Sequence, residues 1–200
     1  MTLLGNVLTV GVATLASRVL GFVRDALIAA VLGTSPVADA FVVAFRLPNL
    51  FRRLFAEGAF SAAFVPAYVA MREGEGEDAA RRFAGAALVL LLTVIGVVSV
   101  IAVVWAEALV GLVAPGFAAD PGKRALAADL TRLCFPYLAA VSAVALLGGM
   151  LGASRRFLAA ASAPLVLNLV LIGVLVGLRL AAPGDVAAGR ALSIAVSVAG

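Results

Sequence analysis

Five arginines lie inside segments that are otherwise apolar enough to be membrane-spanning helices. They are Arg18, Arg24, Arg46, Arg52 and Arg53. An arginine at the centre of a bilayer costs about 2.5–3.5 kcal/mol on insertion scales, so five facing lipid would cost on the order of 12–18 kcal/mol. We therefore expect these side chains to face one another across a water-filled cavity within the membrane. A cationic cavity of this kind suits an anionic cargo.

The surrounding sequence is that of a polytopic membrane protein. Of the 200 residues, 64% are hydrophobic and 13% are charged, against about 45–50% and about 25% in ordinary soluble domains. Because a span needs about 20 residues, the length allows six helices at most. We predict an all-α membrane bundle with helices over residues 3–32, 38–71, 83–113, 125–153, 158–180 and 186–200. The last segment is shorter than a full span and has no polar tail, which indicates the front part of a longer protein.

Polar stretches separate these predicted helices. Residues 72–82 are the most polar, and Gly74 and Gly76 predict a solvated loop there, with a short surface helix within it as the alternative. Residues 120–124 predict a second polar loop, and the pair at 155–156 predicts a short basic one. If the amino terminus is cytoplasmic, each side of the membrane carries five basic residues outside the buried ones, so the positive-inside rule gives no orientation.

The residue types exclude several functions. Cys134 is the single cysteine and there is no histidine, which rules out Cys/His zinc sites and Ser-His-Asp or Cys-His catalytic groups. We therefore predict that the chain is not an enzyme and uses no cofactor or metal. The net charge is +4, but no basic run is interleaved with exposed aromatics, so nucleic-acid binding is not expected.

The segment 38–71 carries an ordered polar stripe. Asp39, Arg46, Arg53 and Glu57 fall within about 40° of one another on an ideal helix, so the stripe reads acid, base, base, acid. Arg52 points well away from this stripe. In the first segment Ser17 and Arg24 share one face, and Arg18 and Asp25 share a neighbouring one.

The balance of these charges favours binding over packing. Between residues 17 and 57 the five arginines face only Asp25, Asp39 and Glu57. If the charges paired among themselves merely to fix helix packing, we would expect them to balance. Two positive charges remain, and a cavity for an anion accounts for them. The GxxxG spacings at 148–152 and 173–177 are interpreted as close helix packing.

Several segments also carry a family resemblance. The most specific are SRVLGFVRD at 17–25, ADAF at 38–41, and the block at 46–66 that begins RLPNLFRRLFAEGAF. Further segments are APGF at 114–117, FPY at 135–137, and Ala163-Pro164 with Asn168. With these segments the chain resembles the MviN/MurJ family, the lipid II flippases of bacteria, over essentially its whole length.

The resemblance implies an architecture. The family belongs to the multidrug/oligosaccharidyl-lipid/polysaccharide exporter superfamily, in which two six-helix lobes enclose a central cavity. Residues 1–200 would form the amino-terminal lobe, and the carboxy-terminal lobe of the same protein would be its partner. The resemblance places the chain in the bacterial plasma (inner) membrane with the amino terminus in the cytoplasm.

The resemblance also implies a cargo and a site. The cargo would be lipid II, an undecaprenyl-pyrophosphate-linked disaccharide pentapeptide used in peptidoglycan biosynthesis, moved to the outer leaflet by alternating access. The implied substrate-binding residues are Arg18, Arg24, Asp25, Asp39 and Arg52. The residues given gating or packing roles are Ser17, Arg46, Asn49, Arg53 and Glu57.

Other functions remain as alternatives. A related exporter could carry another polyprenyl-linked saccharide, because charge alone does not distinguish the two cargoes. A non-transporting scaffold of cell-wall synthesis is the alternative from another class. An enzyme acting on pyrophosphate lipids is disfavoured, since it would usually need a histidine or an acidic metal-binding cluster.

Overall fold

The computed structural model describes residues 3–53, 59–154 and 157–199. Glu57 and the pair Arg155-Arg156 lie outside the described residues. The helices are α1 (Leu3–Leu32), α2 (Pro36–Arg52), α3 (Ala59–Glu75), α4 (Glu77–Val104), α5 (Ala106–Val113), the short 3-10 helix η2 (Pro115–Ala119), α6 (Pro121–Cys134), α7 (Tyr137–Ala153), α8 (Phe157–Ala181) and α9 (Asp185–Ala199). The prediction of an all-α bundle is confirmed.

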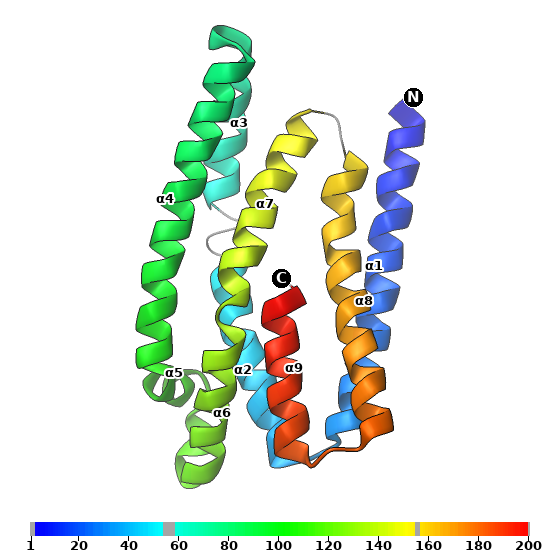
Figure 1. Cartoon of the computed structure of the whole chain (residues 1–200), viewed down its shortest axis with the longest axis vertical. Helices are drawn as coiled ribbons and strands as arrows, with labels where there is room; N and C mark the ends of the chain where they lie inside the picture. Colours follow the sequence, from blue (N-terminus) through cyan, green and yellow to red (C-terminus); the bar gives the residue numbers. More distant parts are fainter. Residues whose placement is uncertain (1–2, 54–58, 155–156, 200) are drawn as a thin grey trace.

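Most of the helices run along the long axis of one elongated bundle (Figure 1). The helices α1 and α8 lie side by side at one edge, and α3 and α4 lie at the other. The helix α2 continues the line of α3 along the axis, α6 and α7 follow one another in the same way, and α9 packs between α7 and α8. The most extensive helix contacts join α1 to α8 and α2 to α6. The contact between α1 and α8 thus brings the first quarter of the sequence against the last.

Local sequence explains where α2 begins. Gly33 has a positive φ of 60° at the turn that follows α1. Ser35 then caps α2, because its hydroxyl accepts from the Ala38 N–H at 3.2 Å and donates to the Leu32 carbonyl at 2.7 Å. Pro36 occupies the first helical position, where its missing N–H has no intrahelical role. This junction fixes the direction in which α2 leaves α1.

Both polar stretches predicted as loops are largely helical, which agrees with the alternative of a surface helix at 72–82. Residues 72–82 are helical except at Gly76, whose φ of +91° separates α3 from α4. Acidic residues in the first turn of a helix are stabilising, and here Glu77 also pairs with Arg81 at 3.6 Å. The second predicted loop contains the start of α6, where the Asp120 side chain caps the helix by accepting from the Lys123 N–H at 2.9 Å. Charge in these stretches reflects exposure at helix ends rather than loop structure.

The segment 38–71 is covered by α2 and α3, and residues 54–58 between them lie outside the described residues. Another predicted helix is divided. The segment 125–153 becomes α6 and α7, with the break at Phe135-Pro136, where proline removes a helical N–H. Pro48, by contrast, is accommodated inside α2.

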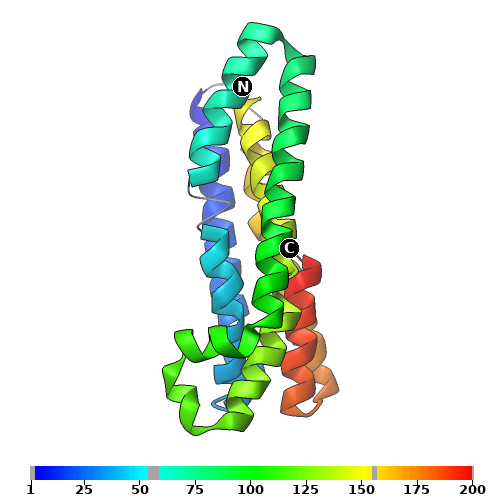
Figure 2. The ribbon, with the colours of Figure 1, turned by 90° about the vertical axis from the view of Figure 1, so that its left-hand side faces the viewer.

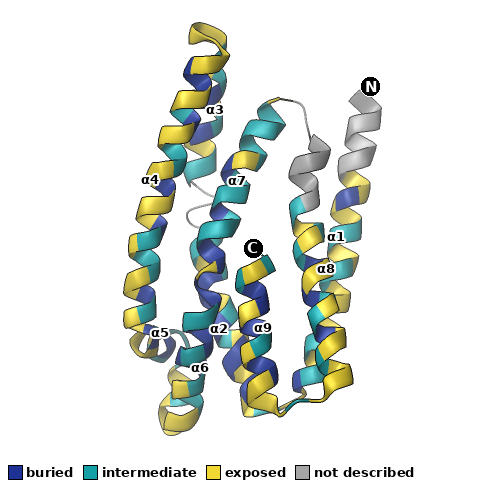
Figure 3. Cartoon of the chain, viewed as in Figure 1, coloured by how far each residue is buried: buried dark blue, intermediate teal, exposed yellow. Residues whose placement is uncertain are grey.

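The outer surface of the bundle is apolar. Figure 3 shows exposed residues along the outer side of α4, and these include Val89, Val97 and Val100. Within the part of the chain that the structure describes, three segments are long and apolar enough to cross a membrane: Glu77–Val104, Pro121–Ala153 and Ala163–Ala181. A water-soluble domain would not leave so much contiguous apolar surface uncovered. The fold is therefore that of a membrane helix bundle, with six spans remaining a prediction.

The helices α2 and α9 pack closely at Gly189, a position that the sequence did not indicate. A Cβ added to Gly189 of α9 would lie 2.6 Å from Val37 Cγ1 on α2. At Gly152, Gly173 and Gly177, which belong to the GxxxG spacings, an added Cβ would meet nothing within 4 Å. The interpretation of these three glycines as close-contact positions is therefore wrong.

We predict that Gly189→Ala lowers the free energy of unfolding of the full-length protein by about 1–3 kcal/mol through overpacking. Gly177→Ala is the matched control and should leave the thermal midpoint unchanged or slightly raised, because alanine favours helix. Thermal unfolding in detergent measures both. Restoration of the midpoint in Gly189→Ala by Val37→Ala would assign the effect to this contact. Equal midpoints for the two single variants would contradict it.

Candidate functional site: a cationic cavity

A cavity of about 1110 Å³ lies among α2, α7 and α8, with one side chain reaching it from α1. Its charged lining residues are Arg24, Arg46, Arg52 and Arg53. None of the described residues that line it is acidic. Four of the five arginines singled out in the sequence thus share one cavity.

The helix α2 supplies the most polar wall of this cavity. Arg46, Asn49 and Arg53 recur at helical spacing and therefore share a face, and all three line the cavity. Arg52 also lines it, although the ideal-helix projection had pointed this residue away. The Asn49 side chain donates to the Phe45 carbonyl at 3.1 Å and accepts from Arg52 Nε at 3.3 Å. Asn49 thus connects the backbone of α2 to one of the cavity cations.

A second group of polar contacts at the cavity involves Arg24 on α1. Its Nη1 donates to Asn168 Oδ1 on α8 at 2.9 Å, and its Nη2 pairs with Asp25 Oδ1 at 2.8 Å. The Arg24 side chain is 18% exposed, whereas that of Asp25 is 65% exposed. Asp25 therefore lowers the electrostatic cost of Arg24 from a more exposed position and does not itself line the cavity.

Asn168 connects α1 and α8. It is 4% exposed. While its oxygen accepts from Arg24, its Nδ2 donates to the Ser17 carbonyl at 3.0 Å. A buried amide with both ends used in this way holds its partners firmly, because leaving either end unpaired would cost free energy. Ser17 thus contributes its backbone carbonyl, rather than its side chain, to the site.

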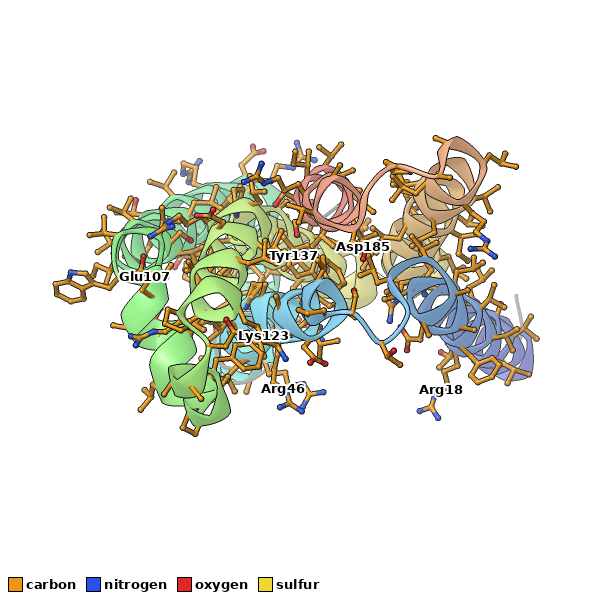
Figure 4. The ribbon with its side chains drawn as sticks, turned by 90° about the horizontal axis from the view of Figure 1, so that it is seen from below. Arg18, Arg46, Glu107, Lys123, Tyr137 and Asp185 are labelled. Carbon is orange, nitrogen blue, oxygen red and sulfur yellow. The ribbon has the colours of Figure 1, made fainter. Side chains whose placement is uncertain are left out.

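Besides Asp25, two more predicted substrate-binding residues lie apart from the cavity lining. Arg18 is exposed, and Figure 4 shows it projecting from the same side of the bundle as Arg46. Asp39 forms an ion pair with Lys123 of α6. The Lys123 Nζ also lies 4.7 Å from the centre of the Phe117 ring. Substrate-binding roles for Arg18 and Asp39 stay predictions.

Sequence reasoning missed two polar partners and one aromatic residue. Asn168 was noted only as part of a family resemblance, and Lys123 only as part of a predicted loop. Tyr137 lines the cavity from α7 and packs 6.1 Å, between ring centres, from Phe45 on α2. A buried asparagine in an apolar helix was an available signal, but its partner on α1 is far away in the sequence. The Lys123 contact with Asp39 carried no sequence signal.

The fold and site together define a class of protein. Arginines gathered at a cavity in a helical membrane bundle are typical of membrane transport proteins, in which ionisable side chains mark the substrate or ion pathway. Residues 28–200 match the family described as Lipid II flippase MurJ. The chain therefore belongs to the MurJ lipid II flippase family, as the sequence resemblance indicated. A flippase moves a lipid without changing its bonds, so this family is one of transporters and not of enzymes.

Named relatives agree with this assignment. The chain is 47% identical, over its whole length, to a probable lipid II flippase MurJ of Rhizobium meliloti (strain 1021), of which it covers 38%. It is 48% identical over 88% of its length to a protein of the same name from Rhizobium tropici, of which it covers 33%. It is also 42% identical over 86% of its length to the lipid II flippase MurJ of Burkholderia cenocepacia, again covering 33% of that protein.

A solved structure supports the fold. The structure titled "Lipid II flippase MurJ, inward closed conformation" superposes with a TM-score of 0.72 at 23% identity. The match covers 95% of this chain and 40% of that one. The chain thus spans about a third to two-fifths of the length of the relatives and the structure that it matches.

We predict that Asp39 and Lys123 are energetically coupled by about 0.2–1 kcal/mol, the range measured for exposed ion pairs. A double-mutant cycle with Asp39→Asn and Lys123→Met, read by thermal unfolding of the full-length protein, measures this coupling. Asp185→Asn is the matched control and should show no coupling to Lys123→Met. Additive effects of the two variants would contradict the pairing.

Proposed function

We propose that the chain forms the amino-terminal lobe of a lipid II flippase in the bacterial plasma membrane. In this proposal it crosses the membrane six times with its amino terminus in the cytoplasm. The remaining length of its relatives supplies the second lobe, which closes the other side of the cavity. The side of the bundle from which Arg18 and Arg46 project (Figure 4) would then face that second lobe rather than lipid.

The observation that carries the proposal is a cavity lined by four arginines and, among the described residues, by no carboxylate. Guanidinium groups bind phosphate oxygens through paired N–H donors. Four such groups around one space suit a dianionic pyrophosphate better than a neutral or cationic cargo. A volume of about 1110 Å³ exceeds that of ordinary small-molecule pockets, which are about 300–1,000 Å³, so the cavity also has room for sugar.

The proposed mechanism is alternating access around this cavity. With the cavity open to the cytoplasm, Arg24 and Arg52 bind the pyrophosphate and the disaccharide pentapeptide follows. Movement of the two lobes against each other then opens the cavity to the outer side, as in transporters built from structural repeats. The polyprenyl chain stays in lipid throughout, and no covalent bond is made or broken.

An exporter of another polyprenyl-linked saccharide would use the same charge chemistry. Lipid II is the cargo proposed here because the relatives at 47% and 48% identity carry that name. A scaffold without transport activity would not require four arginines in one cavity. The variants below therefore also distinguish the scaffold from the transporter.

We predict that Arg24→Ala and Arg52→Ala each abolish transport while leaving the protein inserted and abundant. The test uses cells in which the full-length protein is the sole flippase, and a lipid II-degrading toxin added from outside. Each variant should prevent cleavage of lipid II by the toxin and cause lipid II to accumulate on the inner leaflet. Arg82→Ala, at an exposed position on α4, is the matched control and should behave as wild type.

The same assay separates the cargo from the cavity. Wild-type cleavage in the Arg24→Ala and Arg52→Ala cells would contradict the role given to these arginines. Cleavage that persists after the whole protein is inactivated would contradict lipid II as the cargo. In that case the cationic cavity would belong to a carrier of another polyprenyl-linked saccharide.

We further predict that Asn168→Leu lowers transport by about 10–100-fold, because a buried hydrogen bond to a charged group contributes about 1.5–3 kcal/mol. The physical reason is that Arg24 would lose the partner that holds it at the cavity wall. Thr131→Val removes a buried hydroxyl that bonds only within α6, at 2.7 Å to the Ala127 carbonyl, and should leave transport unchanged. Equal losses in the two variants would indicate a general effect of disturbing the core.

A further inference from the structure

The apolar part of α4 has the length of a lipid bilayer and ends at a tryptophan. No charged residue occurs between Arg82 and Glu107. The helical run from residue 83 to residue 104 is about 33 Å long at 1.5 Å per residue, close to the hydrocarbon thickness of about 30 Å. Trp105 follows this run immediately and is 65% exposed. Tryptophan is enriched at membrane–water interfaces, so Trp105 marks the depth of one interface.

The chain turns at this depth. Trp105 leaves helical geometry, with φ −103° and ψ 28°, and α5 then runs across the bundle axis instead of along it (Figures 1 and 2). Such an orientation places a helix in the plane of the membrane surface. The next residues, η2 and the start of α6, return the chain toward the bundle.

The two long sides of α5 differ. Ala106 and Val110 are fully buried against the bundle. Leu112 is 79% exposed, and Trp105, immediately before the helix, is exposed as well. Glu107 lies about 140° around the helix from Leu112. The helix α5 is therefore amphipathic. One side faces the bundle, the outer side is apolar, and Glu107 points away from that apolar side.

A contact from α6 holds α5 in this orientation. The Arg124 guanidinium donates to the Glu107 carbonyl, with Nε at 3.3 Å and Nη2 at 3.1 Å. It lies so close to α5 that a Cβ added at Gly111 would be 3.0 Å from Arg124 Nη2. Because Arg124 holds α5 in place, the helix cannot rotate to bury its outer apolar face.

We propose that α5 lies in the membrane–water interface with Trp105 and Leu112 inserted among lipid head groups and the adjoining acyl chains. The partner is the lipid surface, because the exposed face is continuous with the exposed apolar side of α4 at Val97, Val100 and Val104. In this position α5 fixes the depth of the corner between α4 and α6. The proposal does not depend on the cargo or on the transport mechanism.

Trp105 is the only tryptophan of the chain and provides the test. Full-length protein is placed in vesicles whose lipids carry bromine either near the head group or near the end of the acyl chain. The tryptophan emission of a Trp105→Phe variant is subtracted from that of the unchanged protein, which isolates the emission of this one indole. An interfacial helix buries its apolar face about 5–10 Å, so quenching by the head-group-proximal bromine should be about twofold stronger than by the deep one. Aqueous iodide should quench weakly.

A second pair of variants tests the orientation of the helix. Leu112→Glu should shift the Trp105 emission to longer wavelength and reduce quenching by brominated lipid. Glu107→Gln, away from the apolar face, should change neither. Strong iodide quenching without lipid quenching would place α5 in water and overturn the proposal. Protection from both quenchers would mean that protein covers the face, and would overturn it equally.

Discussion

The rest of the structure depends on the cost of placing positive charge in apolar surroundings. A charge that faces hydrocarbon loses its hydration, whereas one that faces a polar cavity keeps much of it. The bundle meets this requirement by directing four arginines into one cavity and apolar side chains such as Val89 and Val100 outward. Arg24 is held by Asp25 beside it and by Asn168 across from it.

The same cavity explains why helices far apart in the sequence must pack together. Arg24 lies on α1 and Asn168 on α8, and their hydrogen bond lies within one of the two most extensive helix contacts of the bundle. On the other side of the cavity, Asn49 and Arg52 depend on α2, whose start is set by the Ser35 cap. A membrane bundle gains little from burying apolar side chains that lipid would also accept. Polar contacts and close packing at residues such as Gly189 therefore contribute specificity.

Much of the fold could be predicted from the sequence, because hydrophobicity and helix length report directly on membrane spans. The all-α class followed from composition, and α1 has the predicted bounds. The stretches at 72–82 and 120–124 are largely helical because charge by itself does not indicate a loop: Glu77 and Asp120 stabilise helix starts. The division into α6 and α7 was missed although Pro136 lay at the break, since prolines are also tolerated inside membrane helices, as Pro48 is in α2.

The sequence by itself determined the residue types of the site and the family to which the chain belongs. Buried arginines are conspicuous in an apolar chain, and the block at 46–66 carries the resemblance. Only the tertiary structure decided which of these residues meet. It brought Arg24, Arg46, Arg52 and Arg53 to one cavity and paired Asp39 with Lys123. It also gave Arg24 a buried partner in Asn168. The physical reason is that helical periodicity fixes directions within one helix, while contacts between helices depend on packing that no local pattern encodes.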